Sequence, residues 1–389
     1  MQKIKIISKC LFAGLLSAGL MTGCKNDTPM NMASDESRQF ISLNLNTDVD
    51  VLSAPANDKQ HVRNVMLYIL KADLTTDKYT CVSCEDVGWS DFFGSNLPDD
   101  TAKMTYRLHT VLDPMAAYTF LAVGYEAQLV YQIQTENGTV LFDETATTET
   151  FTLEELKASL LSGKTKNDIA ANEFFAGQLS VTTDENGEIP EGSVVELRRR
   201  VAGISACFTF ENFSEMPGTV AVMLYADQNQ SVPVLKRIWQ EPFFTDYIDS
   251  PLASSGEENN QCLLKMDVKD ESGKWKTNSQ SVYVLPIPAP EYDNTVNYTL
   301  AVVVYNQDRE IIATKRAALS VDGKLIFNTD LGTGIVDDES FYRYPIVANR
   351  FYNLGNADEP LNVNYDPNNP FEVVVEDGWE GIPDLGFGD

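Results

Sequence analysis

The stretch Ala202-Gly203-Ile204-Ser205-Ala206-Cys207-Phe208-Thr209-Phe210 indicates most directly how this chain folds. Apolar side chains at 202, 204, 206, 208 and 210 alternate with smaller or more polar ones at the positions between them. Successive side chains of a β-strand point to opposite faces, so this alternation predicts a strand with one buried face. A helix would instead repeat its apolar residues three or four positions apart.

The same signal recurs along the chain. Residues 103–111 alternate in the same way, and residues 62–70, 118–125 and 295–305 are apolar on both faces, as central strands are. Turn sequences such as Asp184-Glu185-Asn186-Gly187 and Asp322-Gly323 separate the segments. Further strands are predicted at 39–46, 172–182, 218–226, 280–288, 310–319, 346–354 and 370–376. Many short strands with regular turns predict an all-β protein built from β-sandwiches. One helix is predicted, at Leu153–Leu161, because its leucines fit a 3.6-residue period.

The length of 389 residues predicts about two domains. A boundary near residue 195 leaves about seven strands on each side, enough for one sandwich each. We therefore expect an N-terminal β-sandwich at 39–195 and a C-terminal β-sandwich at 196–389. Arg198-Arg199-Arg200 lies at this junction, where it predicts charge pairing; a protease-sensitive linker is the alternative.

The first residues predict export. Lys3, Lys5 and Lys9 precede a short apolar stretch, so residues 1–23 are typical of a signal peptide. The sequence Leu20-Met21-Thr22-Gly23-Cys24 resembles the lipobox of bacterial lipoproteins, which predicts acyl chains on Cys24 and attachment to the outer membrane at the cell surface. Residues 24–38 are polar and predict a flexible tether.

Composition argues against several functions. The formal net charge of −28 disfavours nucleic acid as a partner. With His61 and His109 the only histidines, we expect no catalytic residues, no metal site and no cofactor, and hence no enzyme. Cys81-Val82-Ser83-Cys84 has the spacing of a redox motif, but acidic residues follow it, and a loop with a local disulfide or two thiols is the favoured interpretation. A disulfide between Cys207 and Cys262 is a further option in an exported protein.

Five segments stand out for their order along the chain: residues 62–70, Glu173-Phe174-Phe175-Ala176-Gly177, the segment from Leu197 to Ile204, residues 347–354 and a last strand at 371–379. Together they resemble the fimbrillin superfamily, the lipoprotein subunits of type V pili in Bacteroidetes. The order 349–350 is Asn-Arg, transposed relative to the family pattern. The resemblance spans roughly residues 39–380 and implies two tandem transthyretin-like β-sandwich domains.

The resemblance also implies assembly by strand exchange with other fimbrillin subunits. A protease that cuts after arginine removes the first strand of shaft subunits, and a C-terminal strand of the next subunit fills the groove. The strand-exchange candidates here are Phe40, Ile41, Leu43 and Leu45 in the first strand and Phe371, Val373, Val375 and Trp379 in the last. The loop Thr47–Gln60 contains no arginine, which favours an anchor or accessory subunit that keeps its first strand. The alternatives are cleavage after Arg38 or Arg63 and cleavage by a different protease.

A second function fits the same composition. Surface glycan-binding lipoproteins are also tandem β-sandwiches, and Trp239 and Trp275 are possible platforms for sugar rings. The predicted function is therefore a structural pilus subunit, with glycan binding as the alternative and a host or bacterial surface ligand as a further partner.

Overall fold

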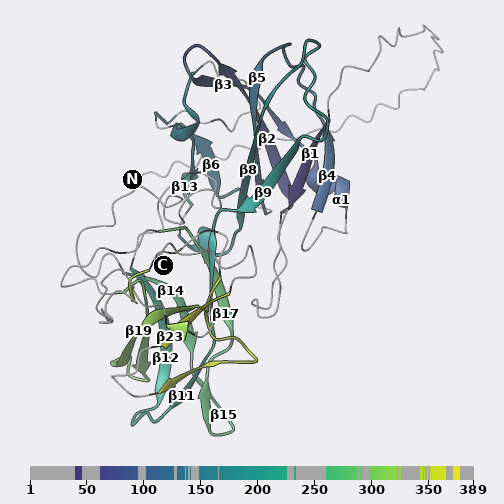
Figure 1. Ribbon diagram of the computed structural model, residues 1–389. Coiled ribbons are helices and arrows are strands. Elements are labelled where there is room, and N and C mark those ends of the chain that lie inside the picture. The colour runs from purple at the N-terminus through teal and green to yellow at the C-terminus, as the bar shows by residue number, and fades with distance from the viewer. Residues whose placement is uncertain are drawn as a thin grey trace, which may run out of the picture. The chain divides into compact units, whose positions relative to one another are not determined.

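The chain is described here by a computed structural model. It covers residues 40–45, 62–94, 102–126, 129–135, 137–138, 141, 149–164, 166–225, 232–233, 260–287, 290, 298–321, 324–325, 342–344, 346, 348, 351–364 and 371–376. Most of these residues lie in strands, which confirms the predicted all-β class (Figure 1). The helices in these ranges are α1 (Trp89–Phe93), α2 (Lys166–Ala170) and a 3-10 turn at Leu153–Glu155. None of the described helices is long and apolar enough to cross a membrane.

The first part of the described chain is a two-layer sandwich. One layer has the strand order β3-β2-β5-β8, the other has the order β9-β1-β4, and β8 joins β9 through two residue pairs. The strands are β1 (Phe40–Leu45), β2 (Asn64–Asp73), β3 (Lys78–Asp86), β4 (Ala102–Arg107), β5 (Ala117–Tyr125), β8 (Phe174–Thr182) and β9 (Val194–Arg199). Side chains of both layers, among them Ile41, Leu67, Phe120 and Val195, form one buried cluster, which we call the first core.

Strand β2 shows why a central strand is apolar on both faces. Its Val65, Leu67 and Ile69 belong to the first core. Its Met66 and Tyr68 belong to a second buried cluster on the other side of the layer, which also contains side chains of β6 (Tyr131–Gln134) and β7 (Lys157–Leu160). The layer is thus covered on both faces, as the sequence of residues 62–70 predicts.

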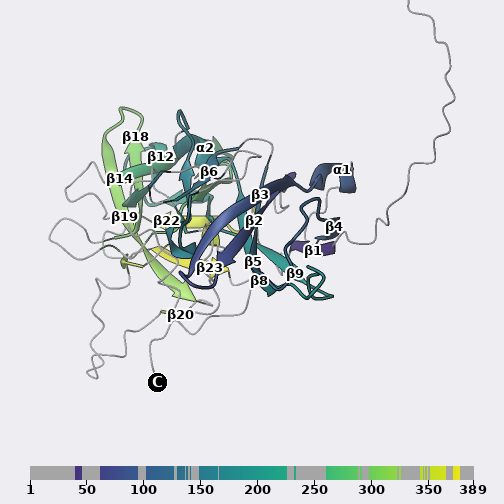
Figure 2. The same ribbon diagram turned by 90° about the horizontal axis from the view of Figure 1, so that it is seen from above.

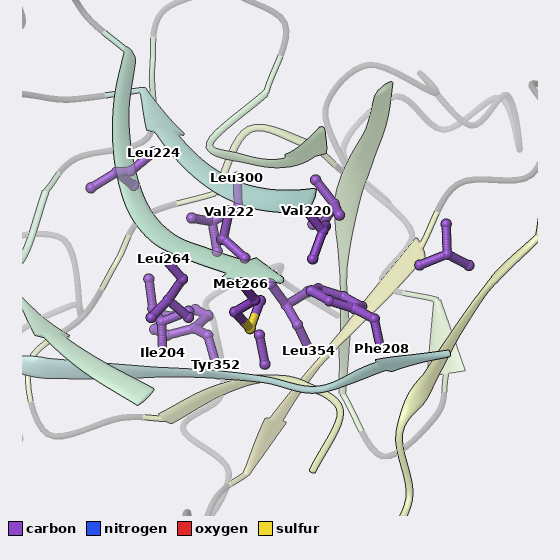
Figure 3. Close-up of a cluster of buried hydrophobic side chains, with 14 of the residues drawn as sticks. Ile204, Phe208, Val220, Val222, Leu224, Leu264, Met266, Leu300, Tyr352 and Leu354 are labelled. Carbon is purple, nitrogen blue, oxygen red and sulfur yellow. The ribbon is translucent and has the colours of Figure 1, made fainter. Parts of the chain in front are cut away.

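The second part repeats this arrangement. Its strands are β10 (Ala202–Ala206), β12 (Pro217–Tyr225), β14 (Asn260–Asp267), β17 (Gln280–Val284), β18 (Leu300–Asn306), β19 (Ile311–Val321), β21 (Phe351–Leu354) and β23 (Phe371–Glu376), with the short β20 (Lys324–Leu325) beside β19. Their order is β14-β12-β18-β19-β23-β21-β10-β17. The buried side chains of β12 and β14 face those of β10 and β21 across the core (Figure 3).

The two strand orders match in chain sequence as well as in space. β1, β2, β3, β4, β5, β8 and β9 correspond in turn to β10, β12, β14, β17, β18, β19 and β21. The directions agree too, because β1 is parallel to β9 and antiparallel to β4, and β10 is parallel to β21 and antiparallel to β17. Strand β23 is the addition: it lies between β19 and β21, whereas β8 and β9 pair directly.

Smaller sheets complete the described structure. β11 (Phe208–Glu211) lies in a four-stranded sheet of order β15-β16-β11-β22, and β13 (Val232–Pro233) pairs with β7. The bounds of the others are Lys269–Glu271 for β15, Lys274–Lys276 for β16 and Leu361–Asn364 for β22.

Two local predictions are wrong. Residues 153–161 are not one helix, because Lys157–Leu160 pairs as β7 with β6, and only Leu153–Glu155 is helical. The stretch 202–210 is two strands, because Cys207 donates its backbone N–H to Leu354 and accepts from Leu361, which carries the chain from one sheet to the next.

The half-buried character predicted for 202–210 also fails in β10, where every residue is buried. The ring of Phe351 lies so close to Gly203 that a Cβ there would overlap it. The face expected to meet solvent is therefore covered by a neighbouring strand.

The domain division at residue 195 stays a prediction. Strand β9 runs across that position and pairs with β1 and β8.

Candidate functional site

Strand β1 is the middle strand of its layer, although it is the first strand of the described chain. It pairs along its whole length with β4, from Phe40↔Arg107 to Leu45↔Ala102, and with β9 from Ser42↔Val194 to Leu45↔Leu197. Figures 1 and 2 both show β1 between β4 and β9. Without β1, the facing backbone groups of β4 and β9 lose their partners, so a slot one strand wide is left.

Two side chains of β1 pack within the first core. Ile41 and Leu43 are 0% exposed and pack within it, whereas Phe40 is 59% exposed. Burying one such aliphatic side chain is worth about 1.5–3 kcal/mol. Of the four candidates in this strand, Ile41 and Leu43 are therefore the ones whose burial the structure describes; for Leu45 it describes the backbone pairing.

Strand β4, on one side of the slot, is tied to β3 independently of β1. The carboxylate of Glu85 in β3 is 7% exposed and accepts hydrogen bonds from the Tyr106 hydroxyl at 2.9 Å and from the backbone N–H groups of His109 at 3.0 Å and Thr110 at 2.8 Å. Burial, with the adjacent carboxylate of Glu85, raises the pKa of Tyr106, so its hydroxyl stays a donor. These contacts link the two end strands of the first sandwich, β3 and β4.

Strand β9, on the other side, is held by a buried ion pair. The guanidinium of Arg199, the last residue of β9, lies 2.5 Å from the carboxylate of Glu173, and their side chains are 4% and 1% exposed. The same guanidinium lies 5.4 Å from the ring of Phe175, 6.0 Å from that of Tyr283 in β17 and 5.9 Å from that of Phe351 in β21. The ion pair expected of the arginine run is thus present. Because both side chains are buried, Arg199 is a poor target for a protease in the folded chain.

Glu85, Glu173 and Arg199 were not among the predicted site residues. Only Arg199 had a signal in the sequence, as part of the single basic run in a very acidic chain. Nothing in the local sequence of Glu85 or Glu173 says that a carboxylate there is buried against backbone donors or a guanidinium.

The last predicted strand is present, and it pairs with strands of its own sandwich. β23 is parallel to β19, from Ala317↔Phe371 to Ser320↔Val374, and antiparallel to β21. Like β1, it therefore lies between one parallel and one antiparallel neighbour. Phe371, Val373 and Val375 alternate along it, whereas Trp379 lies outside the described residues, as do Cys24, His61 and the loop Thr47–Gln60.

The C-x-x-C motif lies in β3, not in a loop. Cys81 and Cys84 both belong to the buried cluster outside the first core, and the structure has Cys81, Cys84, Cys207 and Cys262 as thiols. Among the described residues, no cluster of histidine, cysteine and acidic side chains could hold a metal ion. His109 is exposed, with its Nδ1 3.9 Å from a carboxylate oxygen of Glu85.

Cys81 should resist alkylation in the folded protein. Burial raises the pKa of its thiol to about 11, so the reactive thiolate is scarce at neutral pH. We expect iodoacetamide to modify Cys81 only after denaturation, as measured by peptide mass mapping. Rapid labelling of Cys81 in the native chain at pH 7 would contradict this environment.

The tryptophans give little support to a sugar platform. Trp275 is partly buried against the core of the second sandwich, and Trp239 lies outside the described residues. Trp89 is 1% exposed within the first core.

The fold is thus an all-β one, with two sandwiches of equivalent strand order. The solved structures that match it include a fimbrilin from Porphyromonas gingivalis, with a TM-score of 0.41 and 11% identity over 87% of this chain and 97% of that one. The tip fimbrial protein Mfa3 of the same organism, with a C-terminal truncation, matches with a TM-score of 0.35 and 11% identity over 81% and 93%. A candidate adhesin from Bacteroides ovatus matches with a TM-score of 0.41 and 12% identity over 83% and 91%.

The first of these structures is a fimbrilin, the class of protein that this chain resembles in sequence. No family model and no curated protein matches the sequence.

Proposed function

We propose that this chain is a structural subunit of a surface pilus, joined to other subunits by strand exchange and attached to the outer membrane by acyl chains on Cys24. One observation carries the proposal: β1, the first strand of the described chain, is the middle strand of a layer. A strand in that position, joined to the sandwich through one chain end, can be replaced by a strand of similar pattern from another chain.

The walls of the slot support the proposal, since each has a fastening that does not involve β1. Glu85 fastens β4 to β3, and the pair of Glu173 and Arg199 fastens β9 beside β8. The slot should therefore keep its width when β1 is absent. Such a preformed groove reduces the ordering cost that an incoming strand must overcome.

The alternation of apolar residues in the first and last described strands also supports strand exchange. Ile41, Leu43 and Leu45 repeat at every second position in β1, as Phe371, Val373 and Val375 do in β23. A strand from the C-terminal segment of another subunit would thus present apolar side chains at the spacing that the slot requires. The arginine-free loop 47–60 favours an anchor or accessory place in the fibre, because β1 would then stay attached.

The decisive experiment compares the mature chain with a version that lacks residues 39–46. Two fluorescent peptides are used, one with the sequence of residues 40–45 and one with the sequence of residues 371–379. Both should bind the shortened chain and should not bind the intact chain. The measurement is fluorescence anisotropy. The matched control is the first peptide with aspartate in place of Ile41 and Leu43, which should not bind because it would bury charge in the first core.

Failure of both peptides to bind a folded shortened chain would rule out the slot as an acceptor. Folding is checked by Trp89 fluorescence, because this side chain is buried in the first core.

A further inference from the structure

The outer strands of the two sandwiches, β3 and β14, occupy equivalent places. Each is the end strand of its described sheet. β14 pairs with β12, and β3 pairs with β2 and, at Tyr79 alone, with Phe151 through an isolated bridge on its other side. An end strand presents a row of backbone donors and acceptors to which another chain can add. A protein that accepts strands at one slot must keep such edges closed.

Strand β3 is interrupted by a β-bulge. Ile69 pairs with Ser83 and Leu70 pairs with Cys81, so Val82 is an extra residue. Its side chain packs against the first core. The thiol of Cys81 donates to the carbonyl of Ser83 at 3.4 Å, across the extra residue.

Strand β14 has the same kind of β-bulge at the equivalent position. Val222 pairs with Leu264 and Met223 pairs with Cys262, so Leu263 is the extra residue, and its side chain packs against the core of the second sandwich. The thiol of Cys262 donates to the carbonyl of Leu264 at 3.3 Å. In both strands a cysteine precedes the extra residue and its sulfur reaches the carbonyl two positions on.

The bulge also explains the spacing of the C-x-x-C motif. Val82 packs against the first core, and Ser83 pairs opposite Ile69, which belongs to that core. Cys81 and Cys84 belong to the cluster on the other face of the layer. Three residues apart, two side chains of a regular strand would lie on opposite faces. The bulge therefore explains why both cysteines of the motif lie on the same face of β3.

We propose that these two bulges, each fastened by a cysteine thiol, close the β3 and β14 edges of the two sandwiches to strand addition by further copies of this chain. A bulge bends its strand and increases its twist, so a straight partner strand cannot continue the hydrogen-bond ladder past it. The thiol supplies a local donor that holds the kink in place. Together with the proposed function, on which this last step rests, the closure of these two edges favours the β1 slot as the place for a partner strand.

The test uses the full mature chain with β1 in place. Deleting Val82 and Leu263 together restores regular pairing on both edges. We expect this variant to associate roughly tenfold or more tightly than the parent, a change that corresponds to about 1.4 kcal/mol. The measurement is sedimentation velocity over a concentration series, with thioflavin fluorescence to detect added strands.

Cysteine variants keep the test decisive where the deletions prevent folding. Cys81→Ala with Cys262→Ala removes both thiol donors and should also increase self-association. Cys81→Ser with Cys262→Ser keeps a donor and should behave as the parent does. Cys207→Ala is the matched control, because its thiol also donates to a carbonyl, that of Thr277, but away from the outer strands.

Folded deletion variants that associate no more than the parent would overturn the proposal. If the deletions do not fold, alanine variants that match the serine variants would overturn it equally. These outcomes are separate from the peptide experiment on the β1 slot, which can fail while the edges still prove to be closed.

Discussion

Replacing Arg199 with methionine should lower the free energy of unfolding by about 3–5 kcal/mol. The guanidinium is the partner of Glu173, and both side chains are almost fully buried. Methionine keeps much of the side-chain volume but leaves the carboxylate of Glu173 without its cation in a low-dielectric site. The measurement is urea denaturation followed by circular dichroism at neutral pH.

The double variant Arg199→Met with Glu173→Gln gives the sign of the electrostatic contribution. It should recover part of the loss, because no uncompensated charge is then buried. Lys276→Met is the matched control, since it breaks the exposed pair of Lys276 with Glu271 and should cost less than about 1 kcal/mol. An Arg199→Met variant as stable as this control would show that the pair does not hold β9 beside β8.

Replacing Ile41 and Leu43 with alanine should destabilise the first sandwich by about 2–5 kcal/mol for each site. Both side chains are fully buried, and truncation leaves cavities in the first core that its fixed strands cannot fill. Each 1.4 kcal/mol lost raises the share of chains with β1 released about tenfold, so the double variant should also exchange β1 for an added peptide much faster. Trp89 fluorescence reports unfolding, and anisotropy of a labelled peptide reports exchange.

Ser42→Ala is the control on the same strand, because Ser42 alternates with the two core side chains. It should change stability by less than about 0.5 kcal/mol. If all three substitutions had equal, small effects, β1 would not be an integral part of the first core, and the strand-exchange proposal would lose its energetic basis.

Strands that are buried on both faces were predictable, because burial on both faces gives a continuous apolar run in the sequence. Residues 65–70 are apolar at every position because a core lies on each side of β2. The same local rules failed at Leu153–Leu161, where the leucine spacing fits a helix but pairing with β6 selects a strand. Pairing with a distant segment outweighs a weak local preference.

The site was predictable only in part. The first strand and its alternating apolar residues are visible in the sequence, and the structure places them in the middle of a layer. The contacts that fix the walls of the slot were not visible, because Glu85 meets Tyr106 and His109 only after the sandwich has formed. The bulges could not be predicted for the same reason, because an extra residue is defined by the pairing of two strands and not by the sequence of one strand.

The equivalence of β1 and β10 has a consequence for growth. In the chain, β10 lies between β9 and β11, which both pair within the described sheets, whereas β1 is the first described strand. Under the proposed strand exchange, β1 is therefore the strand that a neighbour replaces, and each molecule receives one neighbour there. We expect polymers formed by this route to be unbranched and to have a direction, with every member oriented like the one before it.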